Sequence, residues 1–203
     1  QLNMTANGSF LNGPFDGDAG TDTVSLAGLT SSQSVTLTAN GAIDGFDGST
    51  STVIGGFLNV DSVAGGAGTD TITGMDVVAI WEIDGTNTFE DDPTNRMLAF
   101  SDFENLQGGG LSDRFNVTGA QTNSILGGVG DDVIAFADLA TLAGTINGES
   151  GSDIVDFSAY VSGGVTATVG DFISIEQIIG GATALDSIIG GSGNDDFAVT
   201  DMN

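Results

Sequence analysis

The side chains of this sequence that could do chemistry are almost all carboxylates. The chain has 203 residues, with 28 Asp and Glu against 2 Lys and Arg, and a formal net charge of −26. Cys and His are both absent, which excludes zinc sites built from them and the Ser-His-Asp and Cys-His catalytic sets. Crowded carboxylates attract divalent cations, although the same acidity could serve only to keep the protein soluble.

Paired acidic side chains are also used by hydrolases and lyases, so an enzyme is an alternative interpretation of the acidic composition. A lyase needs a cationic or tyrosine base, and only Arg96, Arg114 and Tyr160 are available. None of these positions stands out, so we expect no enzyme activity. The negative charge repels nucleic acid and anionic membranes. No apolar run reaches the roughly 20 residues of a membrane-spanning helix, so membrane insertion is not expected.

A glycine–aspartate pattern recurs along the chain. Two positions flanked by apolar residues precede Gly-Gly, and a spacer, Gly, another residue and Asp follow. Clean copies occupy residues 63–72, 125–134 and 188–197, and degraded copies begin at Phe15, Leu106, Ile146 and Ile178. A second string, with an acid between apolar residues, leads into three of the turns and supplies Asp61, Glu104 and Glu176, which we expect to face solvent. Such self-similarity indicates a repeat protein.

The segments between the turns predict short β-strands, because they are rich in Val, Ile, Thr and Phe. Examples are residues 23–26, 34–38, 77–81 and 164–169. Helical patterns are scarce, and the best candidate is the short segment 136–142. We expect the glycines to supply positive φ at sharp corners, and the aspartates to cap backbone amides there.

The spacing of the turns predicts how the strands stack. The first glycines at positions 108, 127 and 148 are about 20 residues apart, which suits one coil with two strands and two corners. The intervals from 17 to 65 and from 65 to 108 suggest about two coils each, and the interval from 148 to 180 predicts an insertion or an extra half-coil. The sequence thus predicts an all-β parallel solenoid over residues 1–203 as a single domain. Trp81 is expected in its core, and a loop at 82–97 is expected to protrude, with Arg96 folding back on its acids.

The turns resemble the Gly-Gly-x-Gly-x-Asp repeats of the repeats-in-toxin family and of giant bacterial surface adhesins. Residues 153–160, 164–166 and 175–181 are similar to stretches that flank such repeats, and residues 81–87 with 103–106 resemble modules of giant surface proteins. The resemblance implies a right-handed β-roll, secretion, and Ca²⁺ held between consecutive turns, with Asp132 and Asp153 as the best pair. The ligands it implies are Asp22, Asp70, Asp113, Asp131, Asp132, Asp153, Asn194 and Asp195.

These observations together predict a structural or adhesive module outside the cell, on a bacterial surface or secreted. We expect a segment of a longer repeat protein or a filament subunit, which associates head-to-tail with other copies or with neighbouring repeats. Two alternatives stay open. One is a calcium-dependent module that binds glycan or ice, and the other is an accessory module of a secreted polysaccharide-active enzyme.

Overall fold

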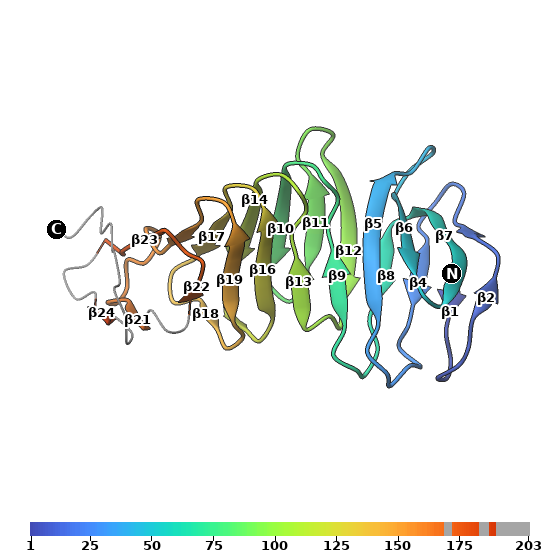
Figure 1. Ribbon diagram of the computed structural model, residues 1–203, viewed down its shortest axis with the longest axis horizontal. Helices are drawn as coiled ribbons and strands as arrows, with labels where there is room; N and C mark the ends of the chain where they lie inside the picture. The colour runs from blue at the N-terminus through green and yellow to red at the C-terminus, as the bar shows by residue number, and fades with distance from the viewer. Residues whose placement is uncertain (169–171, 183–186, 190–203) are drawn as a thin grey trace.

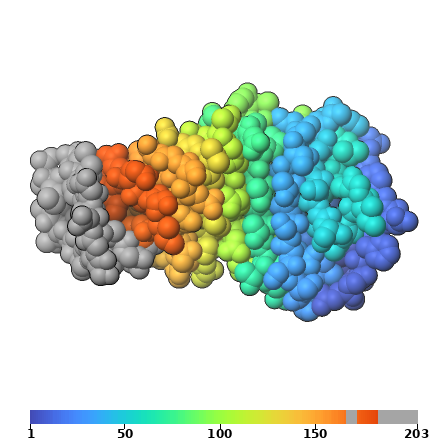
Figure 2. Space-filling model, in the orientation of Figure 1, coloured from blue at the N-terminus to red at the C-terminus, as the bar shows by residue number. Residues whose placement is uncertain are grey.

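The computed structural model describes residues 1–168, 172–182 and 187–189, and every regular element in these ranges is a β-strand. Most strands belong to two ten-stranded sheets, which we call sheet A and sheet B. The two sheets run along the long axis of the molecule (Figure 1). The body is elongated and is broadest in its N-terminal part, coloured blue to cyan in Figure 2. No helix long and apolar enough to cross a membrane occurs in the described ranges.

The order of the strands in space differs from their order in the chain. In spatial order, sheet A contains β1 (Leu2–Asn3), β4 (Thr23–Ser25), β8 (Ser62–Ala64), β12 (Arg96–Ser101), β11 (Thr88–Asp91), β10 (Ala79–Ile83), β14 (Asp113–Val117), β17 (Val133–Phe136), β20 (Ile154–Asp156) and β23 (Gln177–Ile179). Sheet B contains β2 (Leu11–Asn12), β7 (Val53–Val60), β6 (Phe46–Thr50), β5 (Ser34–Asn40), β9 (Thr71–Thr73), β13 (Asn105–Gln107), β16 (Ser124–Val129), β19 (Ile146–Ser150) and β22 (Phe172–Ile173), and β3 (Phe15–Asp16) also pairs with β7. Two small sheets pair β15 (Ala120–Gln121) with β18 (Thr141–Leu142) and β21 (Thr166–Thr168) with β24 (Ser187–Ile189).

The core lies between the two sheets, because each short strand turns its central side chain inward. In-register parallel pairing then places these side chains in continuous rows. The inward row of sheet B consists of Val35, Ile72, Leu106, Ile125 and Ile146. The inward row of sheet A consists of Trp81, Phe115, Ile134, Val155 and Ile178. Full burial of one such side chain contributes roughly 1.5–3 kcal/mol.

Trp81 lies in this core, as predicted. Its side chain is fully buried, stacks on Phe115 with ring centroids 5.4 Å apart, and meets Phe89 edge-on at 4.9 Å. These geometries suit the quadrupoles of the rings.

Two antiparallel excursions interrupt the parallel stacking. Strands β5, β6 and β7 form one within sheet B, and β10, β11 and β12 form the other within sheet A. The predicted loop at 82–97 is therefore wrong, because β11 lies inside sheet A and its alternation buries Phe89 and Asp91. Arg96 does not fold back on the nearby acids, since its Nη1 donates to the carbonyls of Gly41 and Gly45.

The excursions also explain the long intervals between turns. Each of the stretches from 17 to 65 and from 65 to 108 contains one excursion and makes one and a half coils, where about two coils were predicted. The first holds β4, β5–β7 and β8 in sheets A, B and A, and the second holds β9, β10–β12 and β13 in sheets B, A and B. The sequence predicts an insertion or an extra half-coil between 148 and 180, and both are present. β20, β22 and β23 lie in sheets A, B and A, which gives the extra half-coil, and β21 leaves both large sheets before β22 rejoins sheet B beside β19. Residues 136–142 form no helix; Phe136 ends β17 and a turn follows.

The Gly-Gly pairs allow the turns to approach each other closely from both sides. A Cβ on the first glycine, as at Gly108, would lie 1.8 Å from the carbonyl oxygen of Gly127 in the following turn. A Cβ on the second, Gly109, would lie 1.9 Å from the carbonyl oxygen of Met75 in the preceding one. Neither Gly108 nor Gly109 has a positive φ. The expectation of positive φ is thus wrong for this pair, and close contact is what requires the glycines there.

Gly108→Ala should therefore destabilise the protein by about 1–3 kcal/mol, the usual cost of overpacking a tight site. Gly163→Ala is the matched control, because its Cβ would meet only Leu139 at 4.0 Å and its φ is not positive. Urea unfolding of both variants measures the difference. Equal midpoints for the two variants would contradict the packing argument.

Candidate functional site

The predicted ligand aspartates lie where a turn passes into a strand. Asp70 directly precedes β9, Asp113 begins β14, Asp132 precedes β17, and Asp153 precedes β20. All four side chains point into the molecule and are at most 2% exposed. Asp22 precedes β4 in the same way and is half-buried. Asn194 and Asp195 lie outside the described residues.

Some of these carboxylates cap their own turn, as the sequence predicts. Asp70 Oδ2 accepts a hydrogen bond from the amide of Gly66 at 2.5 Å, and Asp113 Oδ2 accepts one from Gly109 at 2.8 Å. Each bond satisfies an amide that the sharp corner frees from the sheet ladders.

The second oxygen of these carboxylates, where it is bonded, reaches a different turn. The backbone amide of Asp113 donates to Asp132 Oδ1 at 2.7 Å, and the amide of Asp132 donates to Asp153 Oδ1 at 2.9 Å. The amide of Asp153 in turn donates to Glu176 Oε2 at 2.7 Å. Hydrogen bonds between an amide and a carboxylate are about twice as strong as neutral ones. The four successive turns that carry Asp113, Asp132, Asp153 and Glu176 are thus linked by a row of amide–carboxylate hydrogen bonds, which we call the rail.

A carbonyl contact accompanies five bonds of this kind, and we call each such pair of contacts a turn joint. The later turn lays one backbone carbonyl against the first glycine of the earlier turn, where a Cβ would lie 1.8–2.6 Å from its oxygen. It also offers a carboxylate to the amide of the earlier turn's aspartate, at 2.7–2.9 Å. The joints are Gly17/Asp22 with Asn59/Asp61, Gly65/Asp70 with Asp102/Glu104, Gly108/Asp113 with Gly127/Asp132, Gly127/Asp132 with Gly148/Asp153, and Gly148/Asp153 with Ser174/Glu176.

The two sequence motifs are therefore the two halves of one joint. Of the three acids of the second motif, Glu104 and Glu176 are exposed as predicted, whereas Asp61 is half-buried. Each accepts a backbone amide from an earlier turn. In the three joints of the second motif the residue that presents the carbonyl has positive φ, at 52° for Asn59, 58° for Asp102 and 50° for Ser174. This left-handed geometry suits Asn, Asp and Ser in turns, and it is the signal that the sequence interpretation missed.

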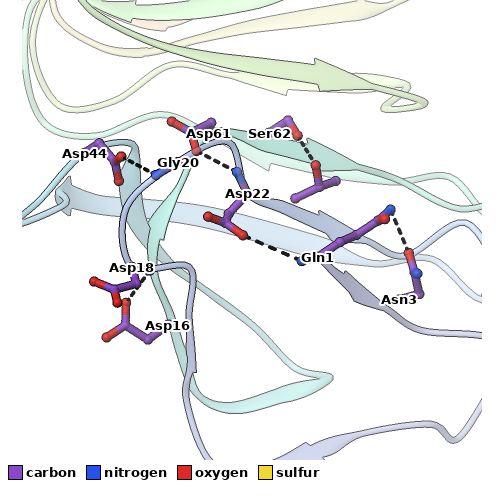
Figure 3. Close-up of polar contacts among 10 residues, drawn as sticks. Gln1, Asn3, Asp16, Asp18, Gly20, Asp22, Asp44, Asp61 and Ser62 are labelled. Atoms are coloured by element: carbon purple, nitrogen blue, oxygen red, sulfur yellow. Dashed lines mark hydrogen bonds and ion pairs between the residues drawn. The ribbon is translucent and has the colours of Figure 1, made fainter.

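The N-terminal joint is shown in Figure 3. The amide of Asp22 donates to Asp61 Oδ2 at 2.8 Å, and the hydroxyls of Thr23 and Ser62 lie 2.6 Å apart beside it. The terminal amine of Gln1 lies 3.6 Å from Asp22 Oδ1. This amine occupies the side of Asp22 on which a further amide donor would stack.

Burial makes these acids hard to ionise. Desolvation raises the pKa of Asp113 from 3.8 to about 7; the amide of Gly109 opposes this rise and the charge of Asp132 adds to it. Desolvation likewise raises the pKa of Asp132 to about 6, against the amide of Asp113 and with the charge of Asp153. The pKa of Asp153 is also raised, chiefly by burial. The rail therefore gains protons near neutral pH.

A calcium shell needs more oxygens than the rail brings to one point. Asp113 Oδ1, Asp132 Oδ2 and Asp153 Oδ2 are buried and accept no hydrogen bond, but Ca²⁺ takes 6–8 oxygen ligands. Within the ranges described, no three acidic side chains converge on a point that could hold a metal ion. Asp131 faces solvent and accepts the amide of Ser152 at 2.9 Å. Asp132 and Asp153 are adjacent as predicted, yet what joins them is a backbone amide. Calcium binding stays a prediction.

No protein-family model matches this chain, and a search of curated proteins gives no match either. Its function is therefore inferred from the geometry of the turns and sheets.

Asp132→Ala should destabilise the protein by about 1–3 kcal/mol, because it leaves the buried amide of Asp113 without an acceptor. Asp132→Asn keeps Oδ1 as an acceptor and removes a buried charge, so its loss should be smaller than about 1 kcal/mol. Chemical denaturation distinguishes the two. Asp131→Ala, an exposed neighbour, is the position control, and similar losses for both Asp132 variants would refute the capping role.

The raised pKa values of Asp113 and Asp132 predict how stability depends on pH. Between about pH 4 and pH 7 the folded protein holds protons that the unfolded chain has released, so the free energy of unfolding falls as pH rises. We expect the melting temperature to decrease from about pH 5 to about pH 8. Acidification also weakens the repulsion among the carboxylates of a chain with a net charge of −26, which favours the folded state. Asp113→Asn, which cannot titrate at this position, should therefore show a shallower dependence; an unchanged slope would contradict the assignment.

Proposed function

We propose that the chain is a right-handed parallel β-solenoid that works as an extracellular structural or adhesive module. Sheets A and B, with their mostly parallel pairing and rows of in-register core residues, support such a fold. The repeat character of the sequence and the resemblance of its turns to surface-protein repeats support a location outside the cell.

The observation that carries this proposal is the recurrence of one joint at five pairs of turns. In the rail from Asp113 to Glu176, Asp132 and Asp153 each receive an amide from one side and donate their own amide to the other. A unit that is both donor and acceptor can be stacked without limit, as in other repeat proteins whose units contact only their neighbours. Rigidity and spacing along one axis are the mechanical properties that such stacking supplies.

Assembly follows from the same geometry. β1 lies at one edge of sheet A, and it is only two residues long. The amide of Met4 points toward Ser25, at 2.8 Å, so the amide of Asn3 points away from the sheet and is open to an added strand. We propose that a neighbouring repeat or a second copy stacks here head-to-tail, by strand addition.

Sedimentation velocity and electron microscopy over a range of concentrations test the assembly. The wild-type chain should form elongated particles that lengthen with concentration. Asn3→Pro removes the outward amide of β1 and should lower the degree of association by severalfold, whereas Asn3→Ala keeps this amide and should not. A strict monomer at every concentration, with and without Ca²⁺, would contradict the assembly proposal. Thermal melts of the same samples test calcium separately: stabilisation on adding Ca²⁺, lost on chelation, is the expected outcome, and identical melts would remove calcium from the fold.

A further inference from the structure

A trough runs along the outside of sheet B, where its strands end and the glycine turns begin. Its volume is about 950 Å³, and it crosses β5, β9, β13, β16 and β19. These strands are neighbours in sheet B (Figure 1). Its lining includes Gly108 to Gly110 and Gly128, which have no side chains to occupy the space.

Polar side chains line the trough at the spacing of the strands. Thr36 of β5 pairs with Thr73 of β9, which pairs with Gln107 of β13. All three are partly exposed and line the trough, one on each successive strand, at intervals of about 4.8 Å. Val129, which is 59% exposed, adds one apolar contact farther along. A ligand that fits this row is extended and carries hydroxyl or amide groups at a similar repeat.

The charge of the trough restricts the ligand further. Asp76 and Glu149 are exposed in its lining, which contains no basic side chain among the described residues. Arg96 is engaged with two backbone carbonyls, and Arg114 lies on β14 of the other sheet, where its Nε donates to Asn116. Gln107 Nε2 donates to Glu149 Oε2 at 2.8 Å, so these two side chains form one polar pair in the trough. Neither Asp76 nor Glu149 meets a cation of the described residues, and a positively charged ligand complements them.

The neighbouring strands favour a glycan over a peptide. Each strand from β9 to β16 pairs on both sides within sheet B, so the trough offers no free edge for a peptide to join as a further strand. We infer that this trough binds an extended linear glycan that carries primary amines. Thr36, Thr73 and Gln107 hydrogen-bond its hydroxyls, and Asp76 and Glu149 pair with its ammonium groups. This binding requires neither calcium nor assembly of the chain.

Isothermal titration calorimetry at about 0.15 M salt, with an oligomer of glucosamine as the probe, tests the inference. The wild-type chain should bind this oligomer and should not bind an oligomer of galacturonate. Asp76→Asn and Glu149→Gln should each weaken binding about 2–5-fold, as expected for exposed ion pairs. Thr73→Ala and Gln107→Ala should each weaken it about fivefold through lost hydrogen bonds.

Asp84→Asn is the matched control for charge. Asp84 lies in an exposed turn outside the trough, and its Oδ1 accepts the amide of Thr86, a bond that Asn retains. Its affinity for the glucosamine oligomer should equal that of the wild type. Two results together would overturn the inference: oligolysine that binds as tightly as the glucosamine oligomer, and unchanged affinity in Gln107→Ala. They would show that the net charge of −26 alone attracts the oligomer. Equal binding of the N-acetylated oligomer would overturn the requirement for amines, and absence of binding would overturn the site.

Discussion

Turns can stack at the spacing of paired β-strands, about 4.8 Å, only if their backbones almost touch. At each corner, this contact brings a carbonyl of one turn against the Cα of another and leaves an amide facing inward, away from the sheet ladders. The chain meets both demands in the turn joint. A glycine such as Gly127 leaves room for the carbonyl, and a carboxylate such as that of Asp153 accepts the amide. Because an unsatisfied buried amide costs about 1–3 kcal/mol, neither element can be dropped freely.

The aspartates are costly to bury, and the structure tolerates this cost because each has a structural use. Asp113 is held by the amide of Gly109 on one oxygen, while its other oxygen lacks the stacked amide that Asp132 and Asp153 receive. The excursion β10–β12 occupies the neighbouring positions in sheet A. The Trp81 indole is near enough to favour the charged carboxylate of Asp113, although its Nε1 makes no regular hydrogen bond.

The excursions are held to each other by a separate polar contact. The side-chain amide of Asn40, at the end of β5, donates to Asp91 Oδ2 of β11 at 2.6 Å, and the hydroxyl of Thr94 donates to the same oxygen at 2.8 Å. Arg96 then donates to two carbonyls in the turn that follows β5. The two excursions therefore brace the broad N-terminal part without disturbing the register of β9 and β13.

Much of this architecture could be predicted from the sequence, because its periodicity is local. The alternation in Thr23–Ser25 and the Gly-Asp turns predict strands and corners directly. The strand Thr88–Asp91 could not be found in this way, since its four residues and the nearby Pro93 look like a loop until sheet A surrounds them. Pairing between motifs was equally hidden: Glu104 and Asp70 are far apart in the sequence, and only stacking shows that one caps the other.

The joints all point the same way along the molecule. In each of the five, the amide belongs to the earlier turn and the carboxylate to the later one, as with Asp22 and Asp61. Each turn of the rail therefore has two chemically different sides, because it offers a carboxylate oxygen toward the earlier turn and an amide N–H toward the later one, as Asp132 and Asp153 do. A turn placed in reverse would set carboxylate against carboxylate or amide against amide. These hydrogen bonds thus fix the direction in which successive turns can stack.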